Sequence, residues 1–216
     1  MSIQPLLVTS VIDRLEQALL TLDRAAAGAI MRAFLAEHGP AALADELLIP
    51  AMDRIGTGWE QGGVALSQVY MSGRLCETLM EDLLPPGGVA RPQPRLAIAT
   101  LTDYHLLGKR LVTGVLRSAG YEVRDYGRQE VAPLVEHAAR DNVQVLMISV
   151  LMLPSALQVE EVRTRLRALG SPARIVVGGA PFRLDRQLWQ RVGADGVGYT
   201  ASDALRLVRE LTEGNQ

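Results

Sequence analysis

The sequence predicts an α/β protein in two parts: a four-helix bundle over residues 1–84, followed by a five-stranded parallel sheet domain over residues 96–216. Three observations predict this arrangement. Apolar residues recur at helical spacing in the first part, and short apolar runs alternate with helical stripes in the second. A segment rich in proline and glycine, residues 85–95, lies between them. We therefore expect two domains joined by a linker.

Four apolar stripes at helical spacing predict the bundle, since four short helices of this kind can bury one another's apolar faces. A helix stop is expected at His38-Gly39-Pro40, because glycine can end one helix and proline can begin the next. The stripes consist of Ile12, Leu15 and Leu19; Ile30, Met31, Phe34 and Leu35; Leu47, Leu48, Ala51, Met52 and Ile55; and Leu66, Val69, Tyr70, Gly73, Cys76 and Met80.

The expected linker contains four prolines and two glycines. Each proline lacks an N–H and fixes φ, while the glycines loosen the backbone, so helices rarely cross such a stretch. Beyond it, strands are expected over residues 96–101, 121–126, 143–150, 175–177 and 196–199, with helical stripes between them and a last helix over residues 201–211. Strands that alternate with helices predict a parallel sheet covered on both faces.

Composition limits the classes of function. The chain has 216 residues and a net charge of −2, which argues against a bulk electrostatic preference for nucleic acid or an acidic membrane. Aromatic residues make up 4%, too few for a base-stacking platform, and the single cysteine rules out an intrachain disulfide. No apolar run is long enough to span a bilayer, and no basic residue precedes Arg14, as a signal peptide would require. We expect a soluble, cytoplasmic protein.

Polar and small residues follow the predicted strands at the edge where ligands bind in open α/β sheets. His105 follows the first strand, and a neutral imidazole is a common metal ligand at pH 7. Asp103, two residues earlier, can orient such a ring. Gly108, Ser149 and the Gly178-Gly179 pair have little bulk and predict a slot beside the strands. No glycine lies between the first strand and Gly108, so a dinucleotide-binding fingerprint is absent.

These residues carry a resemblance. Asp103-x-His105-x-x-Gly108, Ser149-x-Leu151 and Gly178-Gly179 resemble the DxHxxG…SxL…GG signature of cobalamin-binding domains. Ser149 follows His105 by 44 residues and Gly178 follows Ser149 by 29, spacings that fit this family. Residues 52–56 and 61–69 resemble the helical cap that precedes the domain in corrinoid proteins of methyltransferase systems and in methionine synthase. The resemblance implies a flavodoxin-like (Rossmann-like) sheet domain after the cap, and cobalamin as cofactor, either methylcobalamin or another B12 form.

The resemblance also implies roles for individual residues. His105 would displace the corrinoid's own base and ligate cobalt, Asp103 would hydrogen-bond the other imidazole nitrogen, and Ser155 would end a His–Asp–Ser relay. The cap would cover the upper face of the corrin through Trp59, Val69 and Tyr70. Further cofactor contacts are expected from Thr102, Tyr104, Leu106, Gly108, Ser149, Leu151, Leu153, Gly178, Gly179 and Ala201.

The implied function is that of a methyl carrier between a substrate-specific methyltransferase and an acceptor methyltransferase, a component rather than a complete enzyme. An alternative is a light or cofactor sensor that acts through a regulator protein, since Trp59 is typical of light-sensing relatives. Those sensors carry a Glu-His pair where this chain has Val69 and Tyr70, whereas methyltransferase relatives carry an acidic residue where it has Leu106. A flavodoxin-like or receiver-type domain that binds FMN or nothing is the third alternative. Whether the chain forms a homodimer is left open.

Overall fold

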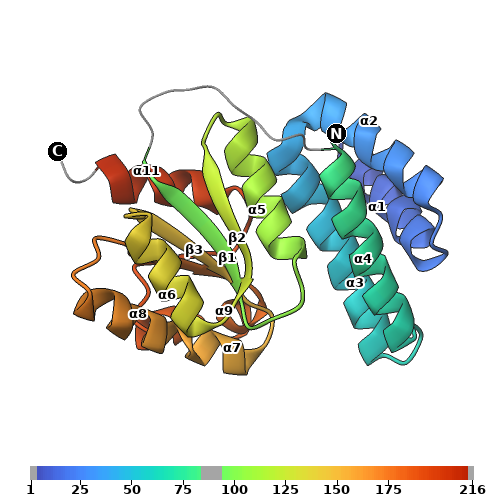
Figure 1. The fold of residues 1–216 in the computed structure, drawn as a ribbon. Helices are drawn as coiled ribbons and strands as arrows, with labels where there is room; N and C mark the ends of the chain where they lie inside the picture. The colour runs from blue at the N-terminus through green and yellow to red at the C-terminus, as the bar shows by residue number, and fades with distance from the viewer. Residues whose placement is uncertain (1–3, 84–93, 214–216) are drawn as a thin grey trace. The chain divides into compact units, whose positions relative to one another are not determined.

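The computed structural model describes residues 4–83 and 94–213, and the chain divides into two compact units, Met1–Pro85 and Pro86–Gln216. Most of the expected linker, residues 85–93, lies outside the described residues. A helical first unit and a second unit built on a five-stranded parallel sheet confirm the predicted fold class (Figure 1). Each unit is described by itself below.

The first unit is a bundle of helices whose apolar stripes are buried. α1 packs against α2, α3 and α4, and the side chains of Leu15, Leu19, Met31, Leu47 and Ile55 are fully buried. The helices are α1 (Gln4–Leu20), α2 (Arg24–Ala42), α3 (Ile49–Glu60) and α4 (Leu66–Leu83), with a π-helical segment η1 (Leu43–Leu48) between α2 and α3.

Local sequence explains where α2 begins and where it bends. Asp23 caps its start, because its Oδ1 accepts a hydrogen bond from the backbone N–H of Ala26 at 2.9 Å. Gly39 has φ +81° inside the range of α2, and Pro40 follows, so the helix is interrupted at the predicted stop. The π-helical turn that follows has no signal in the apolar pattern.

The second unit is a parallel sheet with the strand order β2-β1-β3-β4-β5. The strands are β1 (Leu96–Leu101), β2 (Val123–Gln129), β3 (Val145–Ser149), β4 (Arg174–Gly178) and β5 (Gly196–Gly198). The helices are α5 (Leu107–Ser118), α6 (Val131–Arg140), α7 (Leu153–Leu157), α8 (Val159–Ala168), α9 (Ala180–Leu184), α10 (Leu188–Arg191) and α11 (Asp203–Glu213).

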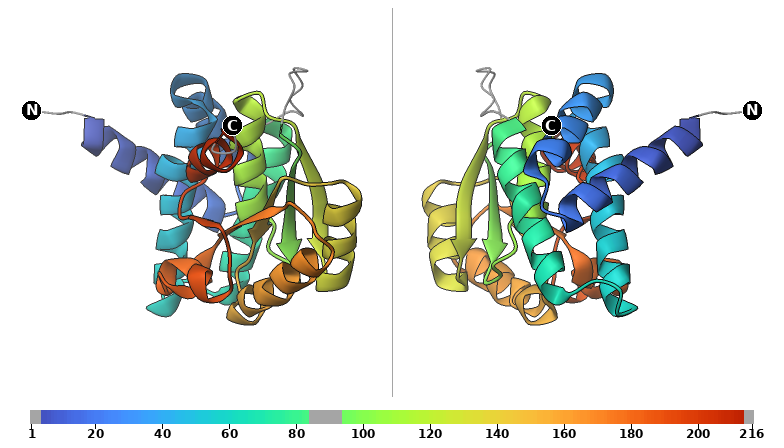
Figure 2. Two further views of the ribbon diagram at one scale, coloured as in Figure 1. Left: turned by 90° about the vertical axis from the view of Figure 1, so that its left-hand side faces the viewer. Right: turned by 90° about the vertical axis from the view of Figure 1, so that its right-hand side faces the viewer.

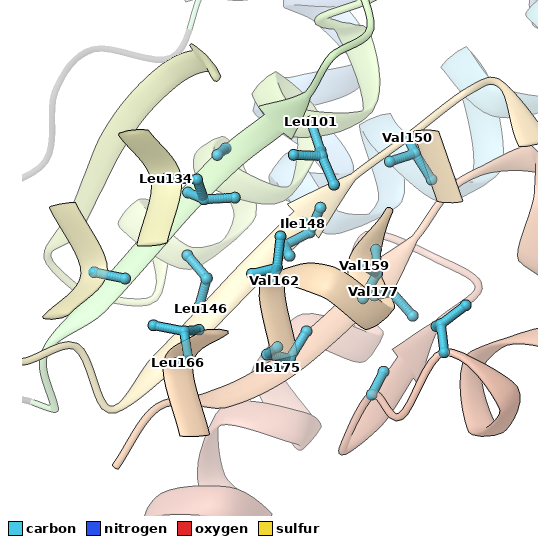
Figure 3. Close-up of a cluster of buried hydrophobic side chains, with 14 of the residues drawn as sticks. Leu101, Leu134, Leu146, Ile148, Val150, Val159, Val162, Leu166, Ile175 and Val177 are labelled. Atoms are coloured by element: carbon cyan, nitrogen blue, oxygen red, sulfur yellow. The ribbon is translucent and has the colours of Figure 1, made fainter. Parts of the chain in front are cut away.

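Two apolar clusters lie on opposite faces of this sheet. One cluster joins the strands to α6 and α8, and includes Leu146, Ile148, Val162 and Leu166 (Figure 3). The other joins them to α5 and α11. α5 and α11 cover one face of the sheet, and α6 and α8 cover the other (Figure 2). Successive side chains along a strand point to opposite faces, so they pack in turn against α6 and α8 or against α5 and α11.

The second strand departs from its predicted range of 121–126. Tyr121 donates its backbone N–H to the Leu116 carbonyl at 3.0 Å and so belongs to the C-terminal cap of α5. The strand therefore begins at Val123. The strand continues to Gln129 through a bulge. β1 pairs Ile98 with Asp125 but Thr100 with Arg128, so β2 holds one extra residue, and Gly127 there has φ +71°.

Candidate functional site

The candidate site lies where the strand order changes direction. β1 has β2 on one side and β3 on the other, although β3 follows β2 in the chain. Ligands of open α/β sheets bind at such a switch point, beyond the carboxyl ends of the strands. Here the segments that leave that edge are residues 102–106, after β1, and residues 150–152, after β3. They contain Asp103 and His105 of the first predicted motif and Leu151 of the second.

Asp103 ties these two segments together. Its buried carboxylate accepts hydrogen bonds through Oδ2 from the backbone N–H groups of Leu151, at 2.6 Å, and Met152, at 3.1 Å. A carboxylate makes stronger hydrogen bonds to N–H groups than a neutral acceptor does. The two segments therefore hold a fixed relation to each other before any ligand is bound.

His105 is exposed beside this anchor. Within residues 4–83 and 94–213 its ring has no hydrogen bond, and the Asp103 carboxylate is occupied by backbone N–H groups instead. The imidazole is thus available to a ligand. The predicted hydrogen bond between His105 and Asp103 stays a prediction for the ligand-bound protein.

Ser155 lies on α7, and its hydroxyl is buried against the His105 segment. The hydroxyl of Thr102 donates to Ser155 Oγ at 2.8 Å. Ser155 therefore supports the segment through Thr102, whose φ of +54° is unusual for a residue with a side chain. The place of Ser155 in a His–Asp–Ser relay stays a prediction.

Small residues form a row across the sheet. Thr100 pairs with Ser149, Ser149 with Gly178, and Gly178 with Gly198, so the row crosses four neighbouring strands in register. The residue before each of Thr100, Ser149 and Gly178 belongs to the cluster that packs against α6 and α8. Because successive side chains in a strand point to opposite faces, these three residues lie on the face covered by α5 and α11. Gly108, in the first turn of α5, lies against this row, since a Cβ there would lie 3.1 Å from Ser149 Oγ.

One feature of this region fits a ligand that inserts between the sheet and its helices, and a second shows how closely two of its segments pack. The fully buried hydroxyl of Thr100 has no hydrogen-bond partner among the described residues. An unpaired buried hydroxyl costs free energy, which a ligand can recover by bonding to it. Gly179 has φ +122°, and a Cβ at this position would lie 1.7 Å from the Val150 carbonyl oxygen. Only glycine fits there.

Several large side chains on or next to the two segments at this edge of the sheet are exposed. Tyr104 is 76% exposed, and Leu151, Met152 and Leu153 are exposed as well. Leu106 is half-buried and Ala201 is buried. In the first unit Trp59 is 46% exposed and Tyr70 is 58% exposed, while Val69 is half-buried. Exposed aromatic and aliphatic groups of this kind can cover a large, flat apolar ligand.

Sequence reasoning missed three polar residues close to the site. Arg128 donates to the Thr102 carbonyl at 3.2 Å, and its guanidinium lies 4.4 Å from the centre of the Tyr104 ring. Lys109 is buried and paired with Asp125 on β2. In the sequence the charged residues of β2 resemble a solvated edge strand. The burial of Lys109, which the sequence does not show, is the signal that sets them apart.

The site offers one imidazole, that of His105, as a metal ligand, which fits a metal ion that already has most of its ligands from a cofactor. No group of three or more His, Cys, Asp or Glu side chains in the described part of the chain could hold a metal ion. One exposed imidazole can still supply an axial ligand to a metal that is already chelated in a plane. A corrinoid meets this requirement, and its nucleotide tail needs a narrow site with small side chains nearby.

Comparison with known proteins identifies the class. The sequence matches two families, each described as B12 binding domain, over residues 95–209 and residues 11–83. The fold is therefore that of a B12-binding protein, and the chain belongs to the B12 binding domain family. Within that class it belongs with the corrinoid proteins, as its relatives indicate.

Three relatives illustrate the match. Dimethylamine corrinoid protein 2 of Methanosarcina mazei is 31% identical, with 80% of this chain and 83% of the relative covered. Dimethylamine corrinoid protein 1 of Methanosarcina acetivorans is 29% identical, with 93% and 96% covered. The structure of the Methanosarcina barkeri monomethylamine corrinoid protein is 27% identical with a TM-score of 0.77, covering 94% of this chain and 99% of that one.

A fourth comparison concerns the fold alone. The crystal structure of a methanol:cobalamin methyltransferase complex from Methanosarcina barkeri contains a chain that is 21% identical, with a TM-score of 0.50; 96% of this chain and 81% of that chain are covered. Among the described helices of the present protein, none is long and apolar enough to cross a membrane.

Proposed function

We propose that this protein binds cobalamin with His105 as the lower axial ligand of cobalt and carries a methyl group between two methyltransferases. The observation that supports this most strongly is the exposed imidazole of His105 at the switch point, which has no hydrogen bond within the described part of the chain and lies on a segment held by Asp103. The relatives named as methylamine corrinoid proteins support a role in methyl transfer.

Each part of the site has a task in this proposal. Bound cobalamin supplies a cobalt centre that takes up and gives up a methyl group. His105 would bind the metal, with Thr102, Tyr104 and Leu106 beside it along the segment. Leu151 and Leu153 would contact the corrin, and Gly108, Ser149, Gly178, Gly179 and Ala201 would hold the nucleotide tail.

The first unit supplies the cover in this proposal. Trp59, Val69 and Tyr70 would lie over the upper face of the corrin and keep water and oxidants from the reactive metal. A methyltransferase can reach the metal only when this cover moves away.

Two enzyme partners belong to this proposal. We propose a substrate-specific methyltransferase as donor and a second methyltransferase as acceptor. The names of the relatives favour a methylamine as the source of the methyl group. The light or cofactor sensor that acts through a regulator protein remains the second candidate. The FMN-binding alternative loses its support, because the sequence matches B12 binding domains over both parts.

A reconstitution experiment tests the binding proposal. The purified chain is mixed with hydroxocobalamin, desalted, and examined by visible absorption. We expect retained pigment with the spectrum of histidine-ligated cobalt in the wild type. His105→Ala should lose that spectral signature, whereas His38→Ala, on α2 in the other unit, should keep it. A wild-type protein that emerges colourless from the column would contradict the proposal.

A second experiment separates carrier from sensor. The loaded protein is reduced and incubated with a methylamine methyltransferase and its methylamine, and the spectrum is followed. A carrier should change its spectrum only when both enzyme and amine are present. A sensor should instead change its elution volume on a sizing column after illumination of the adenosylcobalamin complex, and this result without methyl uptake would favour the second candidate.

A further inference from the structure

The edge strand β2 reaches the His105 segment because of its bulge. Gly127, with φ +71°, donates its N–H to Asp125 Oδ1 at 2.7 Å, which closes the extra residue against its own strand. The bulge shifts the register of every later residue by one, so that Arg128 rather than Gly127 pairs with Thr100. The guanidinium of Arg128 is thereby brought to the carboxyl edge of β1.

Arg128 holds the first half of the segment. It donates through Nη2 to the Thr102 carbonyl at 3.2 Å, and its guanidinium lies over the Tyr104 ring at 4.4 Å. Glu130 accepts from the same nitrogen at 2.7 Å and keeps the side chain extended toward the segment. Tyr104 is otherwise an exposed side chain, so this cation–π contact is what orders the residue directly before His105.

Lys109 holds the other end of the segment. It lies in the first turn of α5, four residues after His105, and its Nζ is 2.5 Å from both carboxylate oxygens of Asp125. Lys109 is the only lysine among the 22 basic residues of the chain, and its side chain is almost completely buried. Asp125 itself is partly exposed, but the pair still links α5 to β2, because loss of the Asp125 carboxylate would leave the buried ammonium of Lys109 without its partner.

Asp125 connects the two anchors, since it binds both Lys109 and the bulge that presents Arg128. We propose that β2 positions the axial histidine: Arg128 and the Lys109–Asp125 pair hold residues 102–109 at both ends, and so set where the His105 imidazole stands. Arg128 is in this sense a positioning residue. The inference rests on the proposed function, because it concerns how well His105 reaches the cobalt.

The test uses Arg128→Gln, which removes the cation and weakens the hydrogen bond to Thr102. Arg128 lies at the surface, so the variant should fold. Arg124→Gln is the matched control, because Arg124 lies on the same strand and pairs with Asp141, away from the segment. Arg128→Lys restores the cation, but with a single donor nitrogen in place of the planar guanidinium, and should recover part of the wild-type behaviour.

Three readouts are compared among the four proteins. In the cobalamin-free chains, amide hydrogen exchange over residues 102–108 should be roughly fivefold to tenfold faster in Arg128→Gln than in the wild type or Arg124→Gln. In the loaded chains, electron paramagnetic resonance of the cobalt(II) form should show a reduced fraction with histidine nitrogen splitting. Cobalamin affinity should fall by a similar factor, roughly fivefold to tenfold.

The outcomes are distinct. Wild-type exchange rates together with an undiminished histidine signal in Arg128→Gln would overturn this inference and leave the proposed function standing. Faster exchange with an undiminished histidine signal would also overturn it, since the order of the segment would then not govern ligation. A wild-type chain that binds no cobalamin would overturn both. An equal loss in Arg124→Gln would show a general effect of strand charge and would count against Arg128.

Discussion

The carboxylate of Asp103 accepts a hydrogen bond from the backbone N–H of Leu151 at 2.6 Å, and so joins the segments that leave two neighbouring strands. A second bond from Met152 to the same oxygen completes the anchor. The relation matters because it fixes the site through backbone atoms rather than through mobile side chains. His105 then lies on a segment that is already ordered when the cofactor arrives, which lowers the entropy cost of binding.

Removal of the Asp103 carboxylate should destabilise the second unit. Asp103→Ala leaves two N–H groups without an acceptor, at a cost of about 2–4 kcal/mol in the free energy of unfolding. Asp103→Asn keeps an acceptor oxygen and should cost about 1 kcal/mol, since only the charge is lost. Urea denaturation measures both values. Equal stability of the alanine variant and the wild type would show that the anchor contributes nothing.

Substitution at Gly179 should be among the most damaging single changes. In Gly179→Ala the new methyl group would meet the Val150 carbonyl oxygen, and the backbone would keep a φ that alanine rarely adopts. We expect a loss of about 3 kcal/mol or more, or no folded protein. Gly198→Ala is the control on the neighbouring strand, because its methyl group would make ordinary contacts of 3.6 Å or longer. Thermal unfolding should separate the two variants, and similar melting temperatures would refute the expected clash.

Two buried threonines should respond in opposite ways to substitution by valine. Thr100 Oγ1 has no partner among the described residues, so Thr100→Val should leave the cobalamin-free chain as stable or more stable by about 1 kcal/mol. Thr113 Oγ1 donates to the Lys109 carbonyl at 2.8 Å, so Thr113→Val should cost about 1 kcal/mol. Chemical denaturation of the two variants checks the sign, and a clear loss in Thr100→Val would mean that its hydroxyl is satisfied after all.

Acid should weaken the second unit in part through Asp141. Hydrogen bonds from Arg124 and Tyr126 hold the pKa of Asp141 well below its ordinary value. A carboxyl with a lowered folded-state pKa contributes stability above its unfolded pKa of about 3.9, and this contribution is lost as the pH falls toward the folded value. Asp141→Asn should therefore be less stable than the wild type at pH 7, and the difference should narrow below about pH 4. Unfolding curves between pH 7 and pH 2 test this, and a constant difference would refute it.

Much of the fold followed from local patterns, and the rest depended on long-range contacts. The alternation of strands and helices predicts the parallel sheet, and the position of His105 and Ser149 at strand ends follows from the same pattern. The contacts of Arg128 did not follow, because a one-residue bulge at Gly127 decides where that side chain lies. Thr102 and Ser155 meet across 53 residues, and no spacing rule predicts such a pair.

The two outer strands also shape how the protein behaves in a crowded solution. β5 is only three residues long, and β2 carries exposed charged residues as well as its bulge. A strand of a neighbouring chain could form few backbone hydrogen bonds with either edge strand, because β5 is short and β2 is bulged and carries charged side chains. This disfavours growth into fibrillar aggregates. The irregularity that brings Arg128 to the His105 segment thus also helps keep separate copies apart.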